Sequence, residues 1–162
     1  MNMLKQTVCY STATTILFLI GCAQPSKSNK EQEAAKARLE ASAKSECFQA
    51  IDEQDVADLK LISYADGTVK GNLLINYAEK GKNDGTIEGK YSGDTLFVDY
   101  TFKIGTQNTT VYKNPLALLK YGDSLILGVG QIETHLGKSY LVKDKPIRFD
   151  RSKFTFAPIK CK

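Results

Sequence analysis

Apolar and polar residues alternate between residues 56 and 156, and this period of two constrains the fold more than any other feature. The clearest run is residues 94–104, where Leu, Val, Tyr, Phe and Ile alternate with polar side chains. Successive side chains of a strand point to opposite faces, so each such run predicts a strand with one buried face. Pairs such as Asp66-Gly67 and Gly122-Asp123 separate the runs and suit hairpin turns. The pattern predicts an antiparallel meander.

A meander with one apolar face must pack against another element or close on itself, and the sequence offers no amphipathic helix as a cover. We therefore expect an all-β fold in which about eight antiparallel strands close into a small barrel or a flattened barrel. The strands are expected near residues 56–65, 68–78, 86–92, 94–104, 107–113, 123–132, 139–143 and 147–156. A short helical turn is expected at Pro115–Lys120, because Asn-Pro favours a helix start. The competing interpretation is a barrel that spans a membrane, which the short strands disfavour.

The shared register of the strands predicts which side chains face the barrel interior. The expected inward set is Val69, Leu73, Ile75, Tyr77, Ile87, Tyr91, Leu96, Val98, Tyr100 and Phe102. Its aromatic members, Tyr77, Tyr91, Tyr100 and Phe102, are candidates for lining a ligand pocket. The alternative is that they fill the core, since the interior of an eight-stranded barrel can be filled by side chains.

The N-terminal segment has the features of an export signal. Lys5 precedes a largely apolar stretch from Val8 to Ile20, whose length fits the ~7–15 residues of such a signal. A membrane-spanning helix would need ~18 or more apolar residues. The segment Leu19-Ile20-Gly21-Cys22 resembles the lipobox of bacterial lipoproteins. This resemblance implies that residues 1–21 are removed and that Cys22 becomes the lipidated N-terminus.

The resemblance also implies where the mature protein resides. Acyl chains on Cys22 would hold it on a membrane in the cell envelope. In Gram-negative lipoproteins an Asp after the Cys favours the inner membrane, so Ala23 implies the outer membrane, with the domain facing the periplasm. Residues 22–46 are polar and rich in helix-forming residues, which predicts a flexible or helical tether before a domain at 47–162.

Two cysteines remain in the domain once Cys9 leaves with the signal and Cys22 carries lipid. Cys47 and Cys161 lie at the two ends of the domain, in an exported and therefore oxidising setting. Their positions suit a disulfide that joins the domain's termini. The alternative is a catalytic thiol with His135 as its base. A zinc site is not expected, because ligands are too few.

The sequence contains no motif for catalysis or cofactor binding, such as GxSxG, HExxH or a P-loop. Asp94 and Asp99 are five residues apart on one expected strand, so their side chains point to opposite faces and do not form a catalytic pair. The net charge of +4 comes from interspersed bases and acids, which does not favour a nucleic-acid partner. We expect no enzyme activity, no cofactor and no metal.

The domain as a whole resembles small bacterial lipoproteins of unassigned function. The resemblance lies in an early Cys, the segment GTIEGKYSGDTLFVDYTF and a terminal Cys, and it implies an exported β-rich domain without implying an activity. The leading hypothesis is a lipid-anchored envelope protein whose barrel binds a small ligand or a protein partner. The alternative is a structural or scaffolding lipoprotein with a filled core. A third hypothesis is an envelope hydrolase with convergent acids or a Cys–His pair.

The lipobox gives a direct prediction. The Cys22→Ala substitution should abolish lipidation and signal processing, because it removes the thiol that receives the lipid. Growth of cells with a radioactive fatty acid should label the wild-type protein and leave the variant unlabelled. Equal labelling of both proteins would contradict the assignment.

Overall fold

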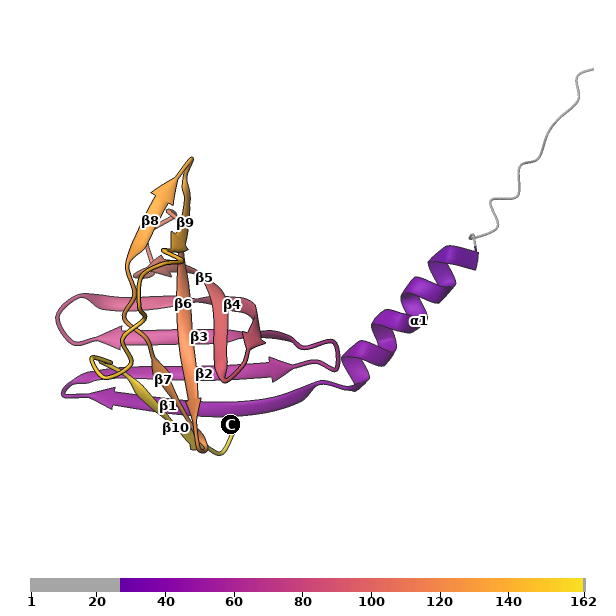
Figure 1. The fold of residues 1–162 in the computed structure, drawn as a ribbon, viewed down its shortest axis with the longest axis horizontal. Coiled ribbons are helices and arrows are strands. Elements are labelled where there is room, and N and C mark those ends of the chain that lie inside the picture. Colours follow the sequence, from indigo (N-terminus) through magenta and orange to yellow (C-terminus); the bar gives the residue numbers. More distant parts are fainter. Residues whose placement is uncertain (1–26, 162) are drawn as a thin grey trace, which may run out of the picture.

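The computed structural model describes residues 27–161, so the predicted signal peptide and Cys22 lie outside the described part. It begins with a helix, α1 (Lys27–Ala41), which extends away from a β domain (Figure 1). In residues 27–161 no helix has both the length and the apolar character needed to cross a bilayer. Ser42 joins the end of α1 to the domain: its hydroxyl donates to the Leu39 carbonyl at 2.6 Å and accepts the Ala65 amide at 3.2 Å.

The β domain is a closed eight-stranded barrel, which confirms the predicted fold class. All pairs of neighbouring strands are antiparallel, in the order β1-β2-β3-β4-β5-β6-β7-β10 and back to β1. The barrel strands are β1 (Lys44–Asp52), β2 (Asp55–Ser63), β3 (Thr68–Tyr77), β4 (Gly81–Ser92), β5 (Thr95–Ile104), β6 (Tyr112–Tyr121), β7 (Ser124–Leu127) and β10 (Thr155–Ile159). Between β7 and β10 the chain leaves the barrel to form a separate hairpin, β8 (Ile132–His135) and β9 (Lys138–Leu141).

Several expected boundaries are wrong. The expected helical turn at Pro115–Lys120 is instead part of β6, where Leu116 and Leu118 pair with Val98 and Leu96. A proline fits here because β7 pairs with β6 only from Leu118 onward, so no strand is paired with Pro115 on that side.

The other differences concern the two ends of the domain. β1 was not among the expected strands and starts within the expected tether. The expected strand at 123–132 divides into β7 and the start of β8. The run at 147–156 contributes only an isolated bridge from Arg148 to Val129 and the first residues of β10. The expected strand at 107–113 starts only at Tyr112, as β6.

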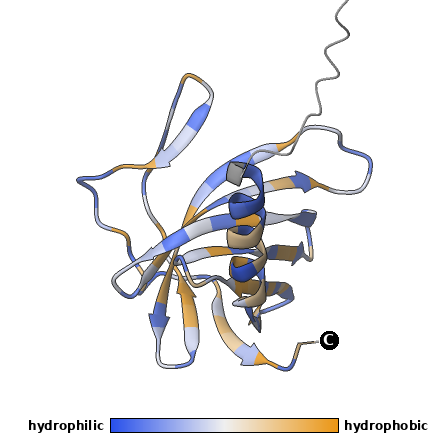
Figure 2. Cartoon of the chain, turned by 90° about the vertical axis from the view of Figure 1, so that its right-hand side faces the viewer, coloured by the Kyte–Doolittle hydropathy of each residue, from blue (hydrophilic) through white to orange (hydrophobic). Residues whose placement is uncertain are grey.

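The barrel interior is packed with side chains from every strand. Eight of the ten residues in the expected inward set are buried: Val69, Leu73, Ile75, Ile87, Leu96, Val98, Tyr100 and Phe102. Tyr77 is half-buried against this core, and Tyr91 is 41% exposed. Tyr91 is exposed because it lies near the end of β4, opposite Leu96 at the mouth of the barrel. Figure 2 shows the corresponding alternation of hydrophobic and hydrophilic residues along the strands.

Two glycines of β4 let the aromatic core fit inside so small a barrel. Gly85 lies opposite Phe102 and Gly89 opposite Val98. A Cβ atom at either glycine would collide with the backbone of β5. The missing side chains allow the two strands to approach closely and to bend.

The predicted disulfide is present and lies where the barrel closes. Cys47 of β1 and Cys161, which follows β10, are bonded across 114 residues of sequence, with their Cα atoms 5.2 Å apart. Beside it, β1 pairs with β10 from Cys47–Ile159 to Gln49–Ala157. The disulfide therefore reinforces the seam between the first and last barrel strands.

The register predicts opposite outcomes for charges on the two faces of β5. Val98→Lys would bury an unpaired charge and should destabilise the fold by more than about 3 kcal/mol. The side chain at position 101 faces outward, so Thr101→Lys should change the free energy of unfolding by less than about 1 kcal/mol. Chemical denaturation of both variants measures the difference. Equal losses would show that the register is wrong.

Candidate functional site

The four candidate aromatic residues lie at three different heights in the barrel. Tyr100 and Phe102 stack in the core with ring centroids 4.5 Å apart. The Tyr100 hydroxyl donates to the buried Leu73 carbonyl at 3.0 Å, and burial raises the pKa of this phenol. These two side chains fill the interior. Tyr77 and Tyr91 lie at opposite ends of the barrel, so the four residues do not surround one pocket.

A cavity of about 660 Å³ opens beside the disulfide, and we call it the disulfide cavity. Its floor is apolar, with the buried side chains of Phe48 and Leu125. Tyr91 lines one wall, and its pKa is raised by burial and, to a smaller extent, by the charge of Glu46. The complete lining is Ser45, Glu46, Cys47, Phe48, Tyr91, Lys120, Asp123, Ser124, Leu125, Pro158, Ile159, Lys160 and Cys161.

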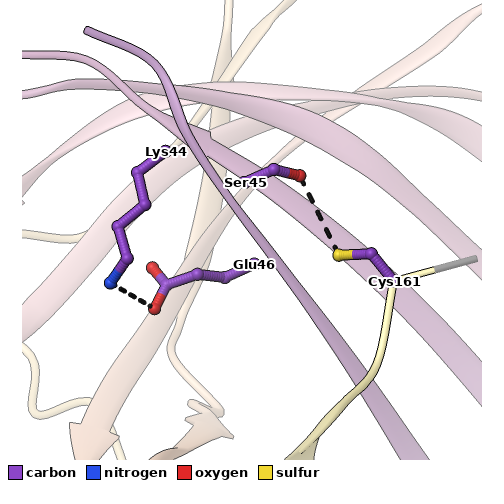
Figure 3. A network of polar contacts seen from close by, with 4 residues as sticks. All are labelled: Lys44, Ser45, Glu46 and Cys161. Carbon is purple, nitrogen blue, oxygen red and sulfur yellow. Dashed lines mark hydrogen bonds and ion pairs between the residues drawn. The ribbon is translucent and has the colours of Figure 1, made fainter.

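The rim of the disulfide cavity is polar, and part of it is shown in Figure 3. Lys44 donates to the Glu46 carboxylate at 3.1 Å, so the charge of Glu46 already has a partner. The Ser45 hydroxyl lies 3.9 Å from the sulfur of Cys161. Among residues 27–161, neither Lys120 nor Lys160 forms an ion pair. Asp123 also lines the cavity and forms no ion pair among these residues, so the rim offers two cations and one acid to a bound group.

A second cavity, of about 760 Å³, lies at the opposite end and is lined by Tyr77 and by the β1–β2 and β3–β4 turns. Lys153 bridges two of its acids, with its ammonium 2.7 Å from Asp55 and 3.4 Å from Asp52. Asp55 also accepts the Ala78 amide at 2.8 Å. The hydrogen bonds from Lys153 and then Ala78 lower the pKa of Asp55. This network ties three chain segments together and pairs Lys153 with both aspartates, while Glu53, Glu79 and Lys80 of the same lining form no ion pair within residues 27–161.

The residues considered for catalysis are engaged elsewhere. The sulfur of Cys161 is bonded to Cys47, and His135 lies on the β8–β9 hairpin outside the barrel. Asp99 pairs with Lys113 at 2.8 Å on the outer face, while Asp94 lies in the β4–β5 turn. In the described part of the chain, no three His, Cys, Asp or Glu side chains form a group that could hold a metal.

Comparison with known proteins gave no match to a protein family, a curated protein or a solved structure. Function must therefore be inferred from this chain's own geometry. The disulfide cavity is the strongest site, because it combines an apolar floor with polar groups that lack partners within the structure. Sequence reasoning identified Tyr91 and the two cysteines, but it missed Phe48 and Lys120. For Phe48, the one available signal was its position directly after Cys47, which places it beside the disulfide.

Proposed function

We propose that this protein is a lipid-anchored cell-envelope protein whose barrel binds a small amphipathic ligand in the disulfide cavity. The observation that carries the proposal is the cavity itself, which has an apolar floor of Phe48 and Leu125 beneath a charged rim. Its volume is within the ~300–1,000 Å³ typical of small-molecule sites. The lipobox at Cys22 and the polar helix α1 support the envelope location, on the periplasmic side of the outer membrane.

The chemistry of the lining indicates an anionic head on an apolar body. Glu46 is paired with Lys44, so the remaining charged groups of the lining are two cations, Lys120 and Lys160, and one acid, Asp123; this excess of positive charge favours a carboxylate, sulfonate or phosphate. The ring of Tyr91 offers an apolar face to the body of the ligand and a hydroxyl to its polar end. A ligand with these properties would bury its chain against Phe48 and Leu125 and keep its charge at the rim.

A second function, that of a structural envelope lipoprotein without a ligand, is favoured by the filled interior. The side chains of Tyr100, Phe102 and their neighbours fill the centre of the barrel. An envelope hydrolase lacks comparable support, because the sulfur of Cys161 is held in the disulfide. The two remaining functions differ in whether a small amphipath binds at the disulfide cavity.

Decanoate, an anionic amphipath, tests the proposal with the full-length lipidated chain released from detergent for native mass spectrometry. One decanoate should bind the wild-type protein, and Tyr91→Ala should weaken binding roughly tenfold because it removes an aromatic contact. Tyr121→Ala is the matched control: Tyr121 is 73% exposed, lies next to Lys120 and does not line the cavity. The control should bind like the wild type.

The charge of the probe provides a further check. Decylammonium has the same chain with a cationic head, and Lys120 and Lys160 should make it bind more weakly than decanoate. Equal binding by the Tyr91 and Tyr121 variants would place the probe elsewhere. No binding to the wild type would favour the structural alternative.

A further inference from the structure

The β8–β9 hairpin projects from the barrel as a separate two-stranded sheet (Figure 1). Its strands pair from Ile132–Leu141 at the base to His135–Lys138 next to the tip. It takes no part in closing the barrel, whose eight strands pair without it. Its strand β9 lies against β6, and the side chains that remain exposed are available for a role outside the fold.

The tip of the hairpin exposes an apolar side chain at a position where the backbone disfavours it. Leu136 and Gly137 form the two-residue turn, with φ angles of +50° and +76°. Turns with two positive φ angles favour Asn-Gly, and a leucine in this conformation is strained. Leu136 is nonetheless 93% exposed, the most exposed large hydrophobic residue of the described chain. Neither the strained backbone nor the exposed side chain of Leu136 stabilises the isolated domain. This points to a contact of Leu136 with something outside the domain.

The rest of the hairpin has the composition of a membrane–water interface. Ile132 and Tyr140 are 44% and 42% exposed along its strands. Lysines stand beside the tip and near the base, together with two acids; these charged residues are Glu133, Lys138, Lys143, Asp144 and Lys145. Leucine and tyrosine side chains enter the headgroup region of a bilayer, while lysine stems keep their ammonium groups in water.

The hairpin and α1 leave the barrel in different directions, and both extend well beyond it. In Figure 1 the hairpin rises from the top of the barrel, while α1 extends to the right and upward, so the hairpin and the N-terminal end of α1 both lie above the middle of the barrel. Cys22 precedes the start of α1, Lys27, by five residues. Five residues can span at most roughly 18 Å. A lipid anchor at Cys22 would therefore hold a bilayer near the N-terminal end of α1, and the hairpin tip is the other part of the described chain that projects far enough from the barrel to reach that bilayer.

We infer that the hairpin tip is a second membrane contact, in which Leu136 inserts into the bilayer that holds the lipid anchor. The inference rests on the proposed lipidation of Cys22. The anchor keeps the tip near the bilayer at a high effective concentration, so one apolar side chain suffices to hold it there. The contact would fix the orientation of the barrel relative to the membrane.

A single tryptophan can report on this contact, because the chain contains none. The full-length lipidated Leu136→Trp variant would be incorporated into vesicles of phosphatidylethanolamine and phosphatidylglycerol, with and without brominated acyl chains. Its emission should shift to shorter wavelength and be quenched by the brominated lipid. Tyr121→Trp is the matched control at the end of β6, and its emission should show neither change.

A second variant keeps the turn but removes the apolar group. Asparagine tolerates positive φ, so Leu136→Asn should fold at least as stably as the wild type. Trypsin cleavage after Lys138 should be slow for vesicle-bound wild-type protein and about tenfold faster for Leu136→Asn, as expected for the loss of one buried leucine.

The outcomes separate this inference from the proposed function. A protein that floats with vesicles but shows no quenching at position 136 would overturn the hairpin contact and leave the lipid anchor in place. A protein that does not float would overturn both. A wavelength shift that requires no vesicles and grows with protein concentration would indicate contact between copies of the chain, and would overturn the inference.

Discussion

The pairing of β1 with β10 is the interaction on which the rest of the structure depends. Only a few residue pairs, from Cys47–Ile159 to Gln49–Ala157, join the first strand to the last, and the Cys47–Cys161 disulfide lies beside them. Without this seam, the sheet would have two open edges and an uncovered apolar face. Closure buries that face on itself, which is why no helix is needed to cover it.

Closure of the barrel also determines where the protein can bind a ligand or contact a membrane surface. Two of the aromatic residues that could have lined an internal pocket instead fill the barrel: Tyr100 and Phe102 are stacked, and Phe102 lies opposite Gly85. The larger openings are therefore at the ends, and the one beside the seam combines Tyr91 with the apolar floor and the unpaired lysines. The chain between β7 and β10 is free to leave the barrel, and there it builds the hairpin that carries Leu136.

Local alternation was sufficient to predict the long central strands. β5 has a regular period of two and pairs along its whole length, so the sequence pattern and the structure agree there. The pairing of β1 with β10 joins strands distant in sequence, which local alternation does not indicate. β6 shows a different failure: Pro115 indicated a helix start, but pairing with β5 determined a strand. The alternation also shows which face a residue occupies but not its height in the barrel, so Tyr91 and Tyr100 looked equivalent although one lies at the mouth and the other in the core.

Amide hydrogen exchange measured residue by residue tests the closed barrel most directly. Beyond Phe156, β10 has only β1 as a partner, so protection of the Ala157 and Ile159 amides reports on the seam alone. A closed barrel predicts that these amides are protected together with those of Gln49, to an extent approaching that of the central strands. Rapid exchange at Ala157 and Ile159, with β3, β4 and β5 still protected, would show an open sheet and contradict the account.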